Sequence, residues 1–410
     1  MKKILTIAVL GGLFAASTLQ AQVSIYIAGS TAFRANVFRA VKAAFDSTPT
    51  IVPATASTGT GVYTMTGTMS SLYGGQSVSV YASFNGSVQG LEDILNNTSI
   101  TFTNATAGGA AVSAVPTITF SDVDKVSTLA ANAAVTETHV AILPFTFCRN
   151  YYAPTTVTNI TGHQLQSLWN NGALKLSFFT GNDADTNNEM YVTGRNKDSG
   201  SRVCAAADTY YTGTPILYGF NTTAPTVFAI MNQNLSPSIY GPGYSSGGNE
   251  AAALTNQNAM ATNLIGSFVG AACVGYEGLN DALTVAGDTS TASTYPNGGG
   301  GCSIVAYDGF LPFNGYTPGV TTQVPAKPDF TPIIKGQYSL WSYECMETAN
   351  THTSDTTYQY YTNFVGQLDN DILQSEVNNG NSSTYGPVTA IRLSEMKCSR
   401  SSVGGAITPN

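Results

Sequence analysis

The positions of apolar and polar residues predict that strands and helices alternate along the chain. Residues 23–28 alternate in polarity and are rich in β-branched side chains, which is typical of a strand. From residue 32 to residue 45, apolar residues recur at helical spacing, and Ser30 or Thr31 is a suitable N-cap for that helix. The first predicted unit is therefore a strand, a short polar turn and a helix.

The same kind of unit recurs further along the chain. Residues 77–84 predict a strand, a polar turn that contains Ser87 follows, and residues 91–95 predict a short helix. Another strand is predicted over 115–120, and it ends just before a polar turn that contains Asp122. Polar side chains therefore follow directly after several predicted strands.

The rest of the chain continues this alternation and adds long insertions. Residues 139–147 predict a buried strand that bends at Pro144, and residues 355–377 predict an amphipathic helix. Residues 47–75, rich in Thr, Gly and Ser, predict an elaborated loop or hairpin, and residues 285–302 predict a Gly-rich loop within a longer insertion at 285–325. Because strands alternate with helices, the sequence predicts an α/β fold with mainly parallel sheets. Further strands are predicted at 272–276, 303–307, 337–343 and 388–393, and further helices at 161–169 and 250–269.

The polar turn at 194–202 carries the most distinctive chemistry in the chain. It follows a predicted strand at 190–193 and precedes a helix-compatible run, so backbone N–H groups and a helix's positive end can point at an anion. Arg195 adds a planar guanidinium that suits a tetrahedral oxyanion, and Ser199 and Ser201 add hydroxyls. Taken alone, the segment also fits an ordinary surface turn that caps a helix.

Polar turns after several strands have a common structural consequence. In α/β folds, ligands bind outside the carboxyl ends of the strands. Ser30 and Thr31, Ser87, Asp122 and Arg195 all fall just after a predicted strand. We expect these side chains to converge on one pocket, which favours a binding site over a set of unrelated surface turns.

The N-terminus has the pattern of a secretory signal. Lys2 and Lys3 precede a short apolar run at 4–16, which is too short to span a bilayer. Leu19-Gln20-Ala21 is an acceptable cleavage site, so we expect cleavage after Ala21. The sequence therefore predicts a periplasmic or secreted protein.

Composition limits the class of partner. Charged residues make up only 10% of the chain and hydrophobic residues 43%, so we expect a packed core and no charge-driven disorder. The formal net charge of −8 becomes more negative when the two lysines of the signal are removed. An acidic surface argues against nucleic acid and anionic lipid as partners. It still allows a small anion to bind to a few local donors.

Six cysteines remain after the predicted cleavage. In an oxidising compartment, an even number of cysteines predicts disulfides, although six allow fifteen connectivities. No Cys-x-x-Cys is present, so we expect neither a redox role nor a zinc ribbon. Proximity along the chain favours Cys273–Cys302 and Cys345–Cys398, which leaves Cys148–Cys204.

Five stretches, in this order along most of the mature chain, carry a resemblance to a known family. The Arg-x-x-x-Ser-Gly-Ser/Thr spacing that begins at Arg195 is the most specific of them. On these motifs, the chain resembles the periplasmic phosphate-binding proteins of ABC importers, which have the type II periplasmic binding protein fold. The stretches are Ala28-Gly29-Ser30-Thr31-Ala32-Phe33, Asn85-Gly86-Ser87-Val88-Gln89-Gly90, Ser121-Asp122, Arg195-Asn196-Lys197-Asp198-Ser199-Gly200-Ser201 and Val274-Gly275-Tyr276-Glu277-Gly278-Leu279.

The resemblance implies a binding site with contributions from two lobes. Thr31 and Ala32 would donate from the start of the first helix. Asp122 would accept a hydrogen bond from the proton of hydrogen phosphate, a proton that sulfate lacks at neutral pH. Arg195 would belong to the second lobe's half of the site. The full set of implied ligand-binding residues is Ser30, Thr31, Ala32, Ser87, Asp122, Arg195, Ser199, Gly200 and Ser201.

The resemblance also implies the organisation and the mechanism. Residues 22–143 and 276–410 would form lobe one, with a C-terminal extension, and residues 144–275 would form lobe two. An open form would bind inorganic phosphate or a similar oxyanion on one lobe, and Arg195 and Ser199 would close from the other. The liganded protein, expected to be a monomer without a cofactor, would dock on an ABC permease in the inner membrane.

Two other classes of function compete with capture of an anion. The first is a structural or surface-interaction protein that keeps the binding-protein fold without binding phosphate tightly. The second is a hydrolase, because residues 243–247 match the Gly-x-Ser-x-Gly pattern, but the preceding segment is a poor strand and no suitable triad histidine follows. His139, His163 and His352 are scattered and no His-Glu-x-x-His occurs, so we expect no catalytic metal.

Overall fold

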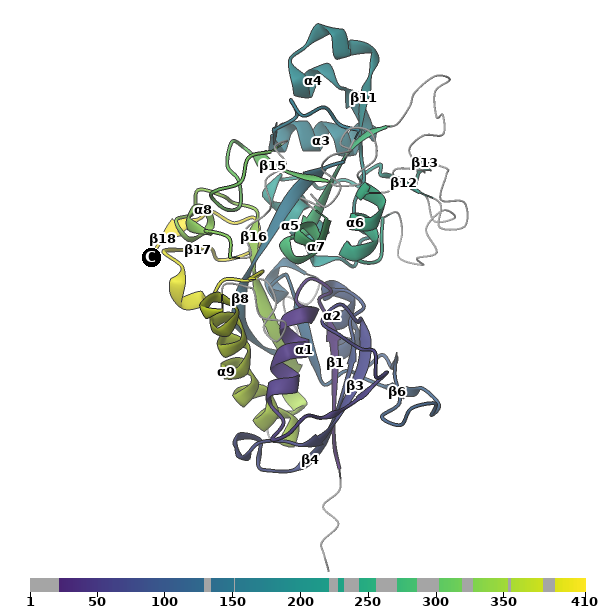
Figure 1. The fold of residues 1–410 in the computed structure, drawn as a ribbon, viewed down its shortest axis with the longest axis vertical. Helices are drawn as coiled ribbons and strands as arrows, with labels where there is room; N and C mark the ends of the chain where they lie inside the picture. Colours follow the sequence, from purple (N-terminus) through teal and green to yellow (C-terminus); the bar gives the residue numbers. More distant parts are fainter. Residues whose placement is uncertain are drawn as a thin grey trace, which may run out of the picture.

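The computed structural model describes residues 22–128, 134–150, 152–220, 228–231, 243–255, 271–285, 302–318, 327–352, 355–378 and 388–410. The predicted signal peptide, most of the 285–325 insertion and the second half of the helix predicted at 250–269 lie outside these residues. Figure 1 shows two lobes arranged along the long axis of the molecule. Among the described residues, no helix is both long and apolar enough to cross a membrane.

A sheet of 12 strands runs through both lobes. Ten of its strands follow the order β10-β11-β14-β8-β16-β7-β1-β4-β3-β2. Of the other two, β15 pairs with β8, and β9 pairs with β15. The strands are β1 (Val23–Gly29), β2 (Thr50–Val52), β3 (Val62–Thr68), β4 (Ser77–Ser83), β7 (Ile118–Ser121), β8 (Val135–Arg149), β9 (Asn159–Ile160), β10 (Ala173–Lys175), β11 (Glu189–Val192), β14 (Ala272–Gly278), β15 (Ser303–Tyr307) and β16 (Trp341–Ala349).

Helices cover this sheet in both lobes. In Figure 1, α1 (Arg34–Ala43), α2 (Ser87–Leu95) and α9 (Thr356–Val377) lie in the lower lobe. The upper lobe contains α3 (Gly162–Asn171), α4 (Ser177–Thr180), α5 (Gly200–Asp208), α6 (Gly247–Thr255) and α7 (Leu279–Val285). A short helix, α8 (Thr331–Ile334), lies beside the boundary.

Smaller elements complete the described part of the chain. Three two-stranded sheets pair β5 with β6, β12 with β13 and β17 with β18. Their bounds are β5 (Ile100–Phe102), β6 (Val112–Ala114), β12 (Tyr218–Phe220), β13 (Phe228–Ile230), β17 (Cys398–Ser399) and β18 (Thr408–Pro409). The 3-10 helices are η1 (Ser71–Tyr73), η2 (Lys125–Ser127), η3 (Asp183–Asn187), η6 (Asn350–His352) and η7 (Leu393–Glu395).

The predicted α/β class is confirmed, but the sheet is mixed and not mainly parallel. β1 pairs in parallel with β4 and β7, and β11 pairs in parallel with β14. The pairs β3–β4, β8–β14 and β8–β16 are antiparallel. The reason is the way in which the strands are connected. Neighbouring strands can be parallel only if a crossover connects them. Two strands joined by a hairpin are antiparallel, and so is a strand that returns from one lobe to the other beside its neighbour.

Strand β8 joins the two lobes. Its first part, from Val135 to Pro144, pairs with β16, and its last part, from Phe145 to Arg149, pairs with β14. Pro144 lies where β8 passes from one partner to the other, a place that suits a residue without an N–H donor. The lobe boundaries proposed from the sequence, after residues 143 and 275, stay predictions.

Two predicted strands near the C-terminus are misplaced. The strand expected at 337–343 begins only at Trp341, and the segment expected at 388–393 forms a single bridge between Ile391 and Ile142. Tyr338 and Leu340 are nevertheless buried, as is Val388. The apolar pattern therefore predicted burial correctly, but buried coil and buried strand share that pattern.

The six cysteines are free and buried, so the predicted disulfides are not present. Cys273 lies inside β14, between β11 and β8, and its backbone bonds to Asn150. Cys302 instead lies beside Cys148, and this thiol neighbour, together with burial, raises the pKa of Cys148 well above its usual value. Proximity along the chain paired Cys302 with Cys273, but the register of the sheet brings Cys302 close to Cys148 instead.

Candidate functional site

Three helix N-termini meet at the boundary between the lobes. Figure 1 shows α1 and α2 at the top of the lower lobe and α5 at the bottom of the upper lobe. Each of these helices is preceded by a strand, namely β1, β4 and β11. Such N-termini present N–H groups and a partial positive charge to the same small volume.

The turn after β1 holds Ser30, Thr31 and Ala32, all of them buried. The Ser30 hydroxyl accepts a hydrogen bond from Phe33 N at 3.1 Å and donates one to Asp122. Helix α1 begins at Arg34, so Ser30 caps the turn that precedes the helix and not the helix itself. Ala32 packs close to Gly278 at the end of β14.

The turn before α2 contacts the Arg195 turn directly. Ser87 is the first residue of α2 and is 1% exposed. Val88 N donates to Asp198 O at 3.2 Å. Gly86 has a φ of 121°, and a Cβ on it would lie 2.8 Å from Asp198 O, so both the conformation and the approach favour glycine. This contact joins the two halves of the candidate site.

Asp122 is a buried carboxyl with several polar neighbours. Burial raises its pKa, whereas the hydrogen bond from Ser30 and the charge of Arg195 act in the opposite direction. Burial and the adjacent Asp122 raise the pKa of Glu344 well above its usual value. Two close carboxyls cannot both ionise easily. We therefore expect Glu344 to hold the proton and Asp122 to carry the charge.

Arg195 reaches between the two halves of the site. Its Nε donates to Tyr244 O at 3.1 Å, and its Nη2 donates to Ser245 O at 3.2 Å. The same Nη2 lies 3.5 Å from Thr31 Oγ1, and Nη1 lies 3.4 Å from Ser201 Oγ. Arg195 is 3% exposed, and its guanidinium faces both the turn before α1 and the start of α5.

The start of α5 supplies the remaining predicted residues. Ser199 is the N-cap, and its hydroxyl accepts a hydrogen bond from Arg202 N at 3.4 Å. Its oxygen lies 2.7 Å from Ser201 Oγ. A Cβ on Gly200 would lie 2.6 Å from Asp122 Cβ and 2.8 Å from Ser87 Oγ. The structure therefore brings the predicted residues of both halves together.

Some residues of this cluster were not identified from the sequence. Tyr244 and Ser245 orient Arg195 through their carbonyl groups, and Tyr276 OH accepts from Arg195 N at 3.1 Å. Glu344 and Glu250 are buried nearby. The sequence indicates a turn at 243–247 but not the contact of this segment with Arg195. Its carbonyl contacts have no sequence signal, because any residue carries that group.

Two further arginines near the site are used in contacts with the protein. Arg34 forms an ion pair with Asp281 at 3.1 Å, in which both side chains are largely buried. Arg202 Nη1 donates to Arg195 O at 3.3 Å. Their charges nevertheless add to the positive potential around the helix N-termini.

The Glu250 carboxyl gives this region a pH dependence. Burial raises its pKa to about 8, against the opposing charge of Arg195. Because the folded state holds the proton more tightly than the unfolded state, stability falls as pH rises from about 4.5 to about 8. We expect Glu250→Gln, which keeps the acceptor for Tyr276 N, to reduce the loss of stability between pH 6 and pH 9 by about 3 kcal/mol.

Urea unfolding at the two pH values measures this effect. Asp46→Asn, a change at an exposed carboxyl, is the matched control and should keep the wild-type pH profile. An equal loss of stability in Glu250→Gln and in the wild type would contradict a titrating Glu250.

No family model matches the chain, and no curated protein matches it. Several solved structures do. One is a Clostridium perfringens phosphate ABC transporter substrate-binding protein with bound phosphate, which is 13% identical to this chain in sequence. The match covers 90% of this chain and 99% of that chain, with a TM-score of 0.49. An ABC-type phosphate transport receptor from Vibrio cholerae is 14% identical to this chain. The match covers 87% of this chain and 98% of that chain, with a TM-score of 0.45.

A third solved structure, PstS from Borrelia burgdorferi, is 15% identical, with 87% of this chain and 96% of that chain covered and a TM-score of 0.39. Each of these three structures is similar to this chain over most of its length, at low sequence identity. This likeness concerns the fold. The ligand of this chain is therefore argued from its own site.

Proposed function

We propose that this chain captures phosphate, or a closely similar oxyanion, between its two lobes for an ABC importer. The observation that carries the proposal is the convergence of Thr31, Ser87 and Asp122 with Arg195 and Ser201 in one buried cluster. Hydroxyls, helix N-termini and one guanidinium are the groups that bind a tetrahedral oxyanion.

The charge balance of the cluster supports an anionic ligand. An ionised Asp122 would balance the charge of Arg195, and the helix N-termini would then leave a partial positive charge in the buried site. An anion that enters between the lobes would replace the direct Arg195–Thr31 contact and accept hydrogen bonds from both residues. Opening and closing of the lobes about β8 would admit and enclose it.

Asp122 gives the proposal its selectivity. An ionised Asp122 can accept a hydrogen bond from hydrogen phosphate, whereas sulfate at neutral pH has no proton to offer. A buried carboxylate facing a sulfate oxygen would be repelled and left without a donor, which costs several kcal/mol. Protonated Glu344, behind Asp122, supports the ionised state of Asp122.

The proposal includes the expected cellular setting. Residues 1–21 would direct the chain out of the cytoplasm, and the liganded monomer would deliver its anion to a permease in the inner membrane. Capture needs no bond to be made or broken on the ligand, so the cluster acts by binding alone.

One observation favours a second candidate, a structural or surface-interaction protein that keeps the fold. Arg195 already donates to the carbonyl groups of Tyr244 and Ser245, so part of its bonding capacity is used within the protein. In this alternative, the Arg195–Thr31 contact would lock the lobes together permanently.

Calorimetric titration of mature protein, freed of bound anion by unfolding and refolding, tests the proposal. We expect phosphate to bind with heat release and sulfate to bind at least about 100-fold more weakly, which corresponds to about 3 kcal/mol. No heat with either anion would favour the structural alternative, and equal affinities would overturn the role of Asp122. Turnover of a chromogenic phosphoester or ester would indicate a hydrolase instead.

A further inference from the structure

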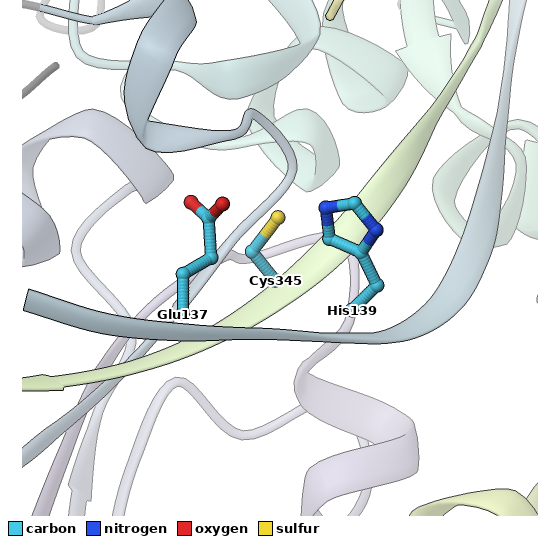
Figure 2. Close-up of side chains that lie close together, drawn as sticks. All are labelled: Glu137, His139 and Cys345. Atoms are coloured by element: carbon cyan, nitrogen blue, oxygen red, sulfur yellow. The ribbon is translucent and has the colours of Figure 1, made fainter. Parts of the chain in front are cut away.

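A second cluster of polar side chains lies on the β8–β16 pair and takes no part in the site described above. Figure 2 shows Glu137 and His139 projecting from β8 on the same side as Cys345 from β16, with the thiol between the other two groups. A carboxylate oxygen, a ring nitrogen and the thiol sulfur all lie within 4.8 Å of one another. Residues distant in sequence thus offer three metal-binding atoms to one point.

A β-bulge creates this arrangement. The pairing passes from Glu344 opposite Ala141 to Cys345 opposite His139, so Val140 is an extra residue in β8. In a regular register, Cys345 would face Val140 and His139 would lie one position further along. Bulges of this kind redirect side chains at functional sites. Here the bulge places an imidazole and a thiol directly across from each other.

The next pair on the same face adds two carboxyls, because Glu347 lies opposite Glu137. Glu347 is fully buried, and neither of its carboxylate oxygens has a hydrogen-bond partner among the described residues. The face that carries the three metal-binding atoms therefore also carries a second, buried carboxyl next to Glu137.

The nearby lysine contacts Glu137 through its backbone. Lys125 Nζ donates to Val135 O at 2.9 Å, while the backbone N–H of Lys125 donates to Glu137 Oε2 at 2.6 Å. The second contact orients the Glu137 carboxylate, as outer hydrogen bonds commonly orient metal ligands. His139 is also oriented, since its ring stacks on Tyr343 with centroids 4.0 Å apart and an interplanar angle of 9°.

We propose that Glu137, His139 and Cys345 bind a zinc ion. Thiolate, imidazole and carboxylate are the ligand types that zinc takes in proteins, at about 2.0 to 2.3 Å from the metal. A tetrahedral arrangement at those lengths separates ligand atoms by about 3.3 to 3.8 Å. Side-chain shifts of about 1 Å would bring the three atoms to that spacing.

An ion can reach the site from solvent, and its binding releases one proton. His139 is exposed, so an ion can approach from solvent, whereas Cys345 is buried beneath it. When zinc binds, the Cys345 thiol releases its proton to solvent and the sulfur donates an electron pair to the metal. The proposal does not depend on the anion site, because none of these ligands belongs to it.

Titration of untagged, reduced mature protein with zinc chloride tests the proposal. We expect one zinc ion per chain in the wild type and at least about 10- to 100-fold weaker binding in His139→Ala. His139 is exposed, so this variant should fold. His163→Ala, at an exposed histidine of α3, is the matched control and should bind as the wild type does. Absence of stoichiometric binding, or unchanged affinity in His139→Ala, would overturn the site.

Cobalt(II) as a probe distinguishes thiolate ligation from adventitious binding. We expect a near-ultraviolet thiolate-to-cobalt charge-transfer band in the wild type and in Cys398→Ser, and loss of the band in Cys345→Ser. Persistence of the band in a folded Cys345→Ser variant would exclude Cys345 as a ligand and overturn the proposal.

Discussion

Replacement of Arg195 by alanine is expected to weaken phosphate binding by more than 100-fold. The guanidinium reaches Thr31 on one side and Ser201 on the other, so it is positioned to donate to an anion between them. Hydrogen bonds to charged groups contribute about 1.5 to 3 kcal/mol each, and loss of two such bonds corresponds to at least about 3 kcal/mol. Calorimetric titration of the variant beside the wild type measures the change.

Two further variants make the Arg195 result specific. Arg195→Lys keeps the positive charge but removes the planar fork, so we expect it to bind phosphate more tightly than Arg195→Ala and more weakly than wild type. Arg392→Ala removes an arginine that pairs with Glu376 and Glu395 outside the site, and should leave binding unchanged. Wild-type affinity in a folded Arg195→Ala variant would show that Arg195 does not contact the ligand.

Gly200→Ala is expected to hinder closure of the lobes and to weaken phosphate binding at least about tenfold. The added Cβ would lie 2.6 Å from Asp122 Cβ and 2.8 Å from Ser87 Oγ, which is closer than these atoms can approach. Because Gly200 is the first residue of α5, alanine there is compatible with the helix itself. The clash falls between the two halves of the site, and overpacking of this kind costs about 1 to 3 kcal/mol.

Two measurements check the Gly200 prediction. Phosphate affinity should fall, and the radius of gyration from small-angle scattering at saturating phosphate should exceed that of the wild type. Gly366→Ala is the matched control, because Gly366 lies in α9 and a Cβ on it meets nothing within 4 Å. Unchanged affinity and unchanged radius in Gly200→Ala would show that the lobes close without this contact.

Much of the fold follows from local patterns in the sequence. The helix predicted at 161–169 formed as α3, where Thr161 and Gln164 make a capping box, and the strand predicted at 303–307 formed as β15. The strand, turn and helix around Arg195 also formed as expected, with Ser199 as the N-cap of α5. Capping and side-chain periodicity act over a few residues, so a single sequence carries them.

The predicted site residues shared one local feature, a polar turn directly after a strand. That feature identifies Ser87 and Asp122 without any information about which residues contact each other. It did not identify Glu344, which lies within β16, or the carbonyl groups of Tyr244 and Ser245 that hold Arg195. These groups become relevant only when distant segments meet.

The sequence by itself therefore determined the order of the elements and the polar turns that end the strands. Only the tertiary structure decided which turns meet, as Gly200 meets Asp122, and which strands pair in which register. The bulge that sets Cys345 opposite His139 is the clearest case. The physical reason is that a one-residue change in register redirects every side chain beyond it, while the local pattern of apolar and polar residues stays the same.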